Sequence, residues 1–258
     1  MIDTHAHLYW QSFDDDRNAV IERAFKQGVE KIINIATDLD TAQQCIVLAE
    51  EYEGLYATAG IHPNDAGKFD DRTIPVLKEF LQHPKVVAIG EIGLDFYRDW
   101  CAREIQERVF REQIRLAKET GRPIIIHNRD AGREIIDVLK SEGFNNLKGV
   151  FHCFSEDLKI AQEILEIGFF ISFTGNLTFK KSRLPEVAMQ IPLEKLLLET
   201  DCPFLSPEPK RGRRNEPANV GYIAEKLAEY KNLPLEELVI ATTINAVNLF
   251  GLGEKDMV

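Results

Sequence analysis

The sequence has few of the features that mark secreted, membrane or zinc-finger proteins. Its four cysteines, at positions 45, 101, 153 and 202, lie far apart and form no C-x-x-C pair, which excludes a disulfide framework and a thiolate metal site. No apolar run approaches the ~20 residues that a membrane-spanning helix needs. The first residues show no basic stretch followed by an apolar one, as a secretory signal would. These absences predict a reduced, cytoplasmic protein outside the membrane.

Basic residues are also in short supply. The chain has 31 Lys and Arg against 42 Asp and Glu, a formal net charge of -11. Proteins that coat nucleic acid without sequence preference neutralise phosphates with an excess of Lys and Arg, so the composition argues against that mode of binding. The acidic net charge does not exclude a local basic surface. Apolar residues make up 44% and charged residues 28%, which is typical of a globular protein.

What the sequence does contain is a regular alternation of short apolar runs with longer amphipathic segments. The segments show helical spacing, for example at Val20, Ile21, Ala24 and Phe25. Such alternation predicts parallel strands. With 258 residues and no linker-like break, the chain fits a single (β/α)8 TIM barrel over residues 1–258. The expected strands are residues 2–7, 31–36, 55–61, 86–91, 123–127, 148–153, 169–174 and 196–201.

An open, doubly wound sheet would show the same alternation. Its usual marker is a glycine-rich turn after the first strand, where this chain has His5-Ala6-His7, so the barrel is favoured. Asp40 and Asp130 are expected to cap helix N-termini. Left-handed helix ends are expected at the glycines that follow helical patterns, namely Gly28, Gly54, Gly121, Gly143 and Gly168.

Residue types that bind metals gather at the predicted strand ends. His5 and His7, two residues apart on one strand, point to the same face and could hold one ion between them. In a (β/α)8 barrel, the C-terminal strand ends meet on the active face. Five of the six histidines occupy such ends. The further ligand candidates there are Glu91, His127, His152 and Asp201.

Four imidazoles and two carboxylates exceed the needs of one catalytic ion, which usually takes three protein ligands. We therefore expect two divalent ions with Glu91 between them, at the ~3.5–4 Å separation at which two metals activate a shared water. Nitrogen and oxygen ligands without a thiolate suit Mg, Mn or Zn. One ion is assigned to His5, His7, Glu91 and Asp201, and the other to Glu91, His127 and His152.

Other polar residues at the strand ends are expected to support the ligands. His62 is expected to contact substrate or a ligand, and Glu199, two residues before Asp201, to orient a ligand. Cys153 and Cys202 directly follow proposed ligands, so strand alternation predicts that they face the core.

Seven ordered strings carry a resemblance to a known family: residues 2–7 (IDTHAH), 60–63 (GIHP), 90–96 (GEIGLDF), 127–129 (HNR), 150–155 (VFHCFS), 198–203 (LETDCP) and 214–217 (RNEP). Together they resemble the TatD family of metal-dependent deoxyribonucleases. The resemblance implies an amidohydrolase-type barrel, two divalent metal ions and phosphodiester hydrolysis. It implies the same six ligands, His5, His7, Glu91, His127, His152 and Asp201.

Two positions depart from that family pattern. Phe96 stands where the family often has tyrosine, and Glu156 where glycine is common. Both departures affect the mouth of the site and not the metal ligands. The phosphotriesterase-like branch of the superfamily bridges its metals with a modified lysine, and Glu91 at that position weighs against this branch.

A polyphosphate substrate requires a local basic surface. Ten basic residues lie beyond the predicted strand ends, and the aromatic residues there could stack exposed bases. The ten are Arg98, Arg129, Arg133, Lys180, Lys181, Arg183, Lys210, Arg211, Arg213 and Arg214. The aromatic residues are Trp10, Phe96, Trp100, Phe154 and Phe179. Substrate contacts are expected from His62, Asp95, Arg129, Arg211, Arg213, Arg214 and Asn215.

The expected function is hydrolysis of DNA by a 3'-5' exonuclease that acts on single strands or frayed 3' ends. Glu91 bridges the ions and Asp201 accepts the proton of the attacking water. No membrane and no obligate protein partner is expected. Two alternatives stay open. The same dinuclear site could hydrolyse another ester, such as a D-aminoacyl-tRNA or a small phosphoester, or the chain could be a non-catalytic, metal-dependent nucleic-acid-binding module.

Overall fold

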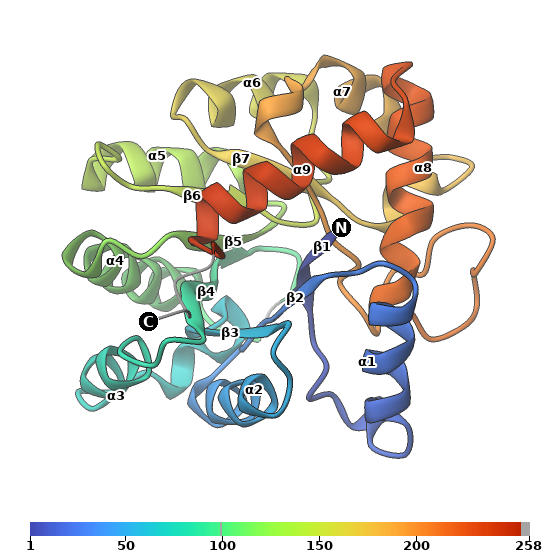
Figure 1. The fold of residues 1–258 in the computed structure, drawn as a ribbon. Coiled ribbons are helices and arrows are strands. Elements are labelled where there is room, and N and C mark those ends of the chain that lie inside the picture. Colours follow the sequence, from blue (N-terminus) through green and yellow to red (C-terminus); the bar gives the residue numbers. More distant parts are fainter. Residues whose placement is uncertain (99, 254–258) are drawn as a thin grey trace.

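Eight parallel strands follow one another round a ring in chain order, and helices surround them (Figure 1). The computed structural model describes residues 1–98 and 100–253. The barrel prediction is confirmed. The strands are β1 (Ile2–Ala6), β2 (Lys31–Asn34), β3 (Leu55–Ala59), β4 (Val86–Asp95), β5 (Ile124–Arg129), β6 (Gly149–Phe151), β7 (Phe170–Phe173) and β8 (Leu196–Leu198).

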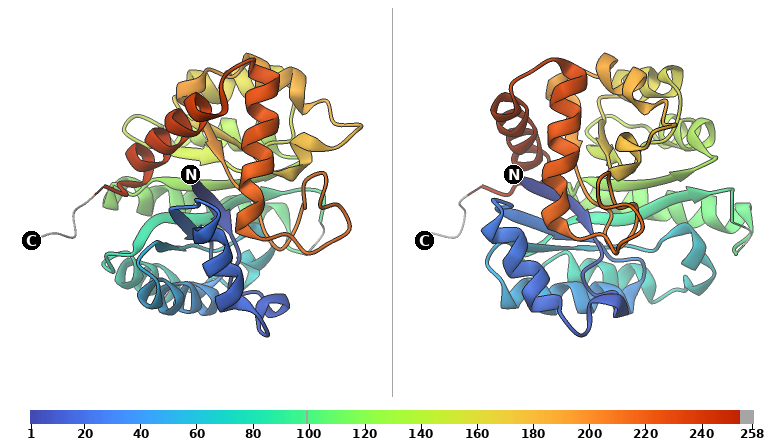
Figure 2. Two further views of the ribbon diagram at one scale, coloured as in Figure 1. Left: turned by 45° about the vertical axis from the view of Figure 1, so that its right-hand side comes forward. Right: turned by 90° about the vertical axis from the view of Figure 1, so that its right-hand side faces the viewer.

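The helices alternate with the strands, as the amphipathic pattern predicts. Helix α1 buries Val20, Ile21 and Ala24, three residues of that pattern. The helices are α1 (Arg17–Lys26), α2 (Leu39–Glu51), α3 (Thr73–Phe80), α4 (Arg103–Thr120), α5 (Gly132–Glu142), α6 (Leu158–Glu166), α7 (Leu184–Gln190), α8 (Val220–Lys231) and α9 (Leu235–Phe250). Figure 2 shows the ring from two further directions, with the long connection between β8 and α8 projecting from the body.

The ring closes between β1 and the segment after β8. His7 N donates to Cys202 O and Asp201 N donates to His5 O, both at 2.8 Å. The Thr4 hydroxyl adds a bond to Leu198 O at 3.0 Å. These contacts place the segment that contains Asp201 beside the histidines of β1. Barrel closure therefore also brings candidate ligands together.

One end of the barrel is covered by helix α9, which crosses the strands in Figure 1. Ala246, Leu249 and Phe250 of this helix form a buried cluster with inward-facing strand residues such as Ile33 and Ile125. The opposite end, where the strands finish, is left to the loops. Within the described ranges no single helix is long and apolar enough to cross a membrane. One pair of segments, Pro217–Lys231 and Leu235–Phe250, reaches the necessary length and apolar composition when the two are taken together, but the pair is bent by 112°.

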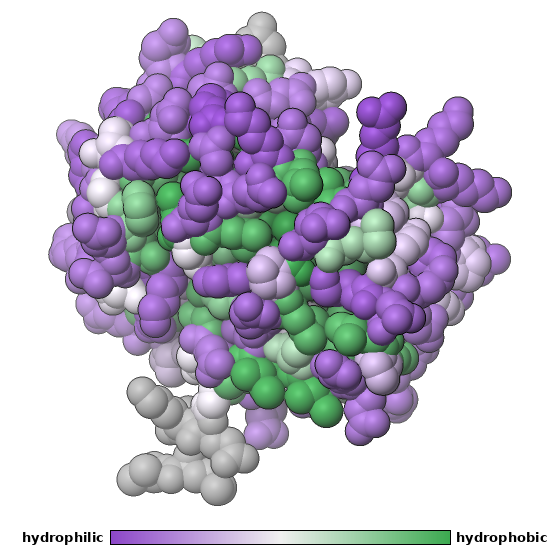
Figure 3. Space-filling view, turned by 90° about the horizontal axis from the view of Figure 1, so that it is seen from above, coloured by the Kyte–Doolittle hydropathy of each residue, from purple (hydrophilic) through white to green (hydrophobic). Residues whose placement is uncertain are grey.

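The face of the molecule drawn in Figure 3 is mostly hydrophilic at its edges, with apolar side chains exposed toward its middle and lower part. On α9, Ile240 and Ile244 are among the exposed apolar residues.

Three local predictions were wrong. The N-cap of α2 is Asp38, which accepts from Thr41 N, and Asp40 lies in the first turn. The N-cap of α5 is Ala131, not Asp130. Gly54 does not end a helix in the left-handed region, although the other four glycines do have positive φ. A Cβ on Gly54 would lie 2.7 Å from Glu30 O, so close packing explains this glycine.

A glycine at the start of β6 provides a test of how tightly the barrel is packed. In Gly149→Ala the new Cβ would lie 2.6 Å from Ile124 O and 2.7 Å from the Phe169 ring. We expect the free energy of unfolding, measured with urea, to fall by about 1–3 kcal/mol because overpacking forces these neighbours apart. The control is Gly67→Ala, since nothing lies within 4 Å of the Cβ position there. Equal stability of the two variants would contradict the packing.

Candidate metal centre

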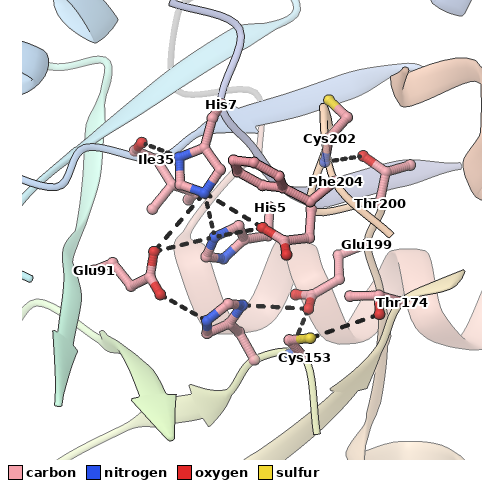
Figure 4. A network of polar contacts seen from close by, with 12 residues as sticks. His5, His7, Ile35, Glu91, Cys153, Thr174, Glu199, Thr200, Cys202 and Phe204 are labelled. Atoms are coloured by element: carbon pink, nitrogen blue, oxygen red, sulfur yellow. Dashed lines mark hydrogen bonds and ion pairs between the residues drawn. The ribbon is translucent and has the colours of Figure 1, made fainter. Parts of the chain in front are cut away.

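The strand ends bring six histidine and carboxylate side chains to one place. His5 is on β1 with His7 just beyond it, Glu91 is on β4, and His127 is on β5. His152 and Asp201 follow β6 and β8. The side chain of His5 is fully buried and that of His127, the most accessible of the six, is 16% exposed. In Figure 4, His5, His7 and Glu91 point toward one another.

Glu91 lies at the middle of this cluster, and its two oxygens face different partners. Oε2 lies 3.5 Å from His5 Nε2 and 3.8 Å from His7 Nε2. Oε1 lies 2.7 Å from His127 Nδ1 and 2.8 Å from His152 Nε2. β4 extends to Asp95, so Glu91 stands within this strand, at a register irregularity between Ile89 and Ile92. Such irregularities re-aim side chains near active sites.

Asp201 completes the group on the Oε2 side. Its Oδ1 lies 3.4 Å from His7 Nε2 and 3.7 Å from His5 Nε2. The two histidine Nε2 atoms are 3.2 Å apart. Four potential ligand atoms from three parts of the chain therefore meet on one side of Glu91.

In two of these imidazoles, those of His7 and His127, the ring nitrogen that points away from the cluster has an acceptor, which fixes the ring. His7 Nδ1 donates to Ile35 O at 2.9 Å, so in the neutral ring Nε2 turns its lone pair toward the cluster. His127 Nε2 lies 3.3 Å from Asp95 Oδ2, which leaves Nδ1 to face Glu91. An outward carbonyl or carboxylate partner is usual for metal-binding histidines.

His152 and His5 differ in how their outward nitrogens are held. His152 Nδ1 lies 3.5 Å from Glu199 Oε1, beyond good hydrogen-bond geometry. His5 Nδ1 has no hydrogen-bond partner within the described residues. Glu199 is itself fixed by Cys153 N at 2.6 Å and by the Ser172 hydroxyl at 2.5 Å. It lies beside the ring nitrogen of His152 that points away from Glu91.

His62 approaches the same cluster in the opposite tautomer. Its Nδ1 accepts from Asn64 N at 3.1 Å, so the neutral ring carries its hydrogen on Nε2, which points toward Glu91 Oε1 at 3.6 Å. Burial and the charge of His127 lower the pKa of His62 to about 3, so the ring is neutral. His62 can group with Glu91 and His127 by distance. Because Nε2 carries a hydrogen, we assign it a donor role instead of metal binding.

The charges in the cluster favour an ionised carboxylate. Burial raises the pKa of Glu91, but the charge of His152 and the hydrogen bonds from His127 and His152 hold it well below its usual value. The pKa of Asp201 is likewise lowered, because the hydrogen bond from His7 and the charge of His5 outweigh burial. Two buried anions thus stand among imidazoles.

These residues fit divalent metal ions. The contacts between Glu91 Oε1 and the nitrogens of His127 and His152, at 2.7 and 2.8 Å, require a proton or a cation between the atoms. In the described part of the chain, no Lys or Arg forms an ion pair with Glu91 or Asp201. Imidazole and carboxylate donors are those that Zn and Mn accept.

A cavity of about 700 Å³ opens above the cluster. Arg129, expected to bind substrate, lines it. Asp95 also lines it, but its oxygens accept from Tyr97 N, Arg98 N and Asn64 Nδ2 and lie near His127. Asp95 is thus placed to orient His127 and the loop after β4, in addition to lining the cavity.

Four predicted substrate contacts lie elsewhere. Asn215 is fully buried, and its amide nitrogen donates to Thr200 O and Phe204 O at 2.9 and 2.7 Å. Arg214 is paired with Asp16. Arg211 lies over the Phe179 ring, and neither it nor Arg213 lines the cavity. The string at 214–217 therefore fastens the β8–α8 connection, a role that only its tertiary contacts reveal.

The structure also corrects the predicted positions of several side chains. Phe154 is buried in the core, whereas Cys153 lines the cavity beside Thr174 (Figure 4). β6 ends at Phe151 and Cys153 has φ +46°, so strand alternation no longer applies. Cys202 is buried, as expected. Sequence reasoning missed Tyr97 and Phe204 of the cavity wall; their only signal was proximity to strand ends.

A (β/α)8 barrel with histidine and carboxylate donors at its strand ends defines the class of amidohydrolase-like, metal-dependent hydrolase folds. The chain belongs to the TatD family: the family model described as TatD related DNase matches residues 2–251. This confirms the predicted resemblance.

Two relatives and one solved structure illustrate the similarity. The chain is 46% identical over 254 residues to "Uncharacterized metal-dependent hydrolase YabD" of Bacillus subtilis (strain 168), covering 98% of this chain and 100% of the relative. It is 37% identical to "3'-5' ssDNA/RNA exonuclease TatD" of Shigella flexneri serotype 5b, covering 98% of this chain and 100% of that protein. The crystal structure of the TatD homologue YJJV from Escherichia coli K12 has a TM-score of 0.92 at 34% identity, with 98% of each chain covered.

The role of Asn215 can be tested by its removal. In Asn215→Ala, the carbonyls of Thr200 and Phe204 lose their donor, and the free energy of unfolding should fall by about 2–4 kcal/mol because buried polar groups are left unpaired. Chemical denaturation measures this. Arg213→Ala in the same loop is the control, since its side chain is exposed, and should change stability by less than ~0.5 kcal/mol. A stable Asn215→Ala variant would refute the role.

Proposed function

We propose that this chain is a metal-dependent nuclease that hydrolyses phosphodiester bonds of DNA, in single strands or at frayed 3' ends. The observation that carries the proposal is the division of the Glu91 carboxylate, with Oε2 3.5 Å from His5 Nε2 and Oε1 2.7 Å from His127 Nδ1. Such a carboxylate can be shared by two ions. The name of the Shigella relative, a 3'-5' ssDNA/RNA exonuclease, supports the substrate and the polarity.

Two groups of residues would hold the ions, which we propose to be Mg, Mn or Zn. Once bound, such ions would bind phosphoryl oxygens and lower the pKa of a water molecule. The first group is His5, His7, Glu91 and Asp201, and the second is Glu91, His127 and His152. Asp95 and Glu199 would keep His127 and His152 oriented, because their carboxylates lie beside the outward ring nitrogens.

The remaining side chains would bind substrate and move the proton. Asp201 takes a proton from the attacking water at its carboxylate, which its lowered pKa keeps ionised. The water oxygen forms the new bond to phosphorus, the bond from phosphorus to the leaving sugar oxygen breaks, and that oxygen takes a proton from solvent. His62 Nε2–H donates to a phosphoryl oxygen, and Arg129 offsets phosphate charge from the cavity wall.

The number of ions can be measured directly. We expect metal-free wild-type protein, titrated with Mn²⁺ in a calorimeter, to bind two ions per chain. Asp201→Asn should lower the affinity for one of the two ions. Glu91→Gln should lower the affinity for both, by more than the roughly 10–100-fold lost when a residue that only hydrogen-bonds to a metal ligand is replaced. The reason is that both groups of ligands share Glu91 alone.

His83→Gln is the matched control for the titration. His83 lies apart from the cluster, 3.2 Å from Glu50, and its replacement should leave both ions in place. A single ion in the wild type, or normal binding by Glu91→Gln, would contradict a shared carboxylate.

Turnover of an end-labelled single-stranded oligonucleotide tests the reaction. Cleavage should stop when a chelator is added and resume when Mg²⁺ or Mn²⁺ is supplied. The products should be a ladder of oligonucleotides shortened from the 3' end. Asp201→Asn should lower kcat by roughly 10²–10⁴-fold because the proton acceptor is lost.

The same assay separates the rival functions. Full activity after complete metal removal would refute the proposal. Cleavage of aminoacyl-RNA or small phosphoesters without cleavage of DNA would indicate another ester as substrate. Metal-dependent binding of DNA without hydrolysis would indicate a binding module.

A further inference from the structure

The exposed aromatic side chains of this protein are concentrated at the metal cavity. Among the described residues, four aromatic side chains are exposed: Trp10 (37%), Tyr97 (64%), Trp100 (68%) and Phe204 (43%). All four line the cavity above Glu91. They include both tryptophans of the chain. Most other large apolar side chains are buried, so this concentration points to a ligand with aromatic faces.

Two of the four form a wall on the side of the barrel closure. Trp10 lies beyond β1 and Phe204 beyond β8, two strands that meet where the ring closes. Their ring centroids are 5.3 Å apart with an edge-to-face angle of 78°. The Phe204 ring lies 6.2 Å from that of His7, beside the ligand cluster (Figure 4). We call this pair the closure wall.

The other two form a second wall, which we call the β4 wall. Tyr97 and Trp100 follow β4, which lies halfway round the ring from β8. The Arg129 guanidinium carbon lies 4.2 Å from the Tyr97 ring centroid, and that of Arg98 lies 4.4 Å from the Trp100 centroid. The two walls thus stand on opposite sides of the metal centre, and the β4 wall carries positive charge.

We propose that the closure wall and the β4 wall stack the bases on the two sides of the scissile phosphate of a single-stranded nucleic acid. This inference rests on the proposed nuclease function and adds how the substrate is selected. Stacking on aromatic rings tolerates any base, because every base has a flat face. Each arginine covers one face of its ring and leaves the other to a base, with its own charge close to the phosphates.

This arrangement selects against duplex DNA. In a duplex the bases are already stacked on one another, so they reach neither wall without unstacking. A single strand or a frayed end presents free bases and gains both contacts. The walls therefore account for a single-strand preference without any sequence-specific hydrogen bond.

An abasic strand tests the proposal. An abasic oligonucleotide has the same phosphates as its base-bearing counterpart but nothing to stack. With the metal-loaded protein, we expect a KM roughly tenfold or more lower for the base-bearing strand. Trp10→Ala and Tyr97→Ala should each raise KM for that strand roughly tenfold, with little change on the abasic strand. Ile240→Ala, on the outer face of α9, is the control and should change neither KM.

The two tryptophans report on the two walls separately. Trp10→Phe leaves only Trp100 as a fluorophore, and Trp100→Phe leaves only Trp10. Addition of a cleavage-resistant phosphorothioate strand should quench the fluorescence of both variants, and an abasic phosphorothioate strand should quench neither. The phenylalanine replacements keep an aromatic ring at each position, so both walls can still stack a base in these variants.

The outcomes distinguish this inference from the proposed function. If the wild type cleaves both strands with equal KM and shows no base-dependent quenching, the walls do not stack bases, while the nuclease function stands. If it cleaves neither strand, the nuclease function fails. The fluorescence measurement then tests base stacking by itself: base-dependent quenching supports stacking on the two walls, and its absence overturns it.

Discussion

The burial of the Glu91 carboxylate among imidazoles is the constraint on which the site depends. Glu91 is 3% exposed, and all of its ion-pair partners in the described residues are histidines. An isolated carboxylate in such surroundings would be strongly destabilising. The cluster therefore needs positive charge, as protons on the histidines or as metal ions. The outward contacts of His7 and His127 direct their other nitrogens toward this charge.

The closure of the barrel supports the same cluster from β1 and β8. The buried carboxylate of Asp3 accepts from Thr200 N at 2.9 Å and from the Thr200 hydroxyl at 2.6 Å. These bonds hold the residue before Asp201 against the strand that carries His5. Asn215 fixes the same segment from the other side through Thr200 O. Stability and ligand geometry are thus served by the same hydrogen bonds.

The surroundings of the cluster divide into two parts that differ in burial and in the kinds of side chain they contain. Near the ligands the groups are buried, polar and tied to one another, as Asp95 and Glu199 show. At the mouth they are exposed and aromatic or basic, as Trp100 and Arg98 show. The buried part does not by itself select the ester to be hydrolysed, since a bound metal ion would polarise a carbonyl as readily as a phosphoryl group. Substrate choice therefore depends on the mouth.

The sequence by itself determined the barrel and the positions of the candidate ligands at its strand ends. Apolar periodicity and chain length specify eight strands and their helices, and ligand types at strand ends are visible as strings such as His5-Ala6-His7. Only the tertiary structure decided which oxygen of Glu91 faces which histidine, that Asn215 is a buried clamp, and that Cys153 and Phe204 reach the cavity. The physical reason is that alternation fixes side-chain direction only within a strand. Beyond it, positive φ at Cys153 and Asp201 and hydrogen bonds between distant segments set the direction.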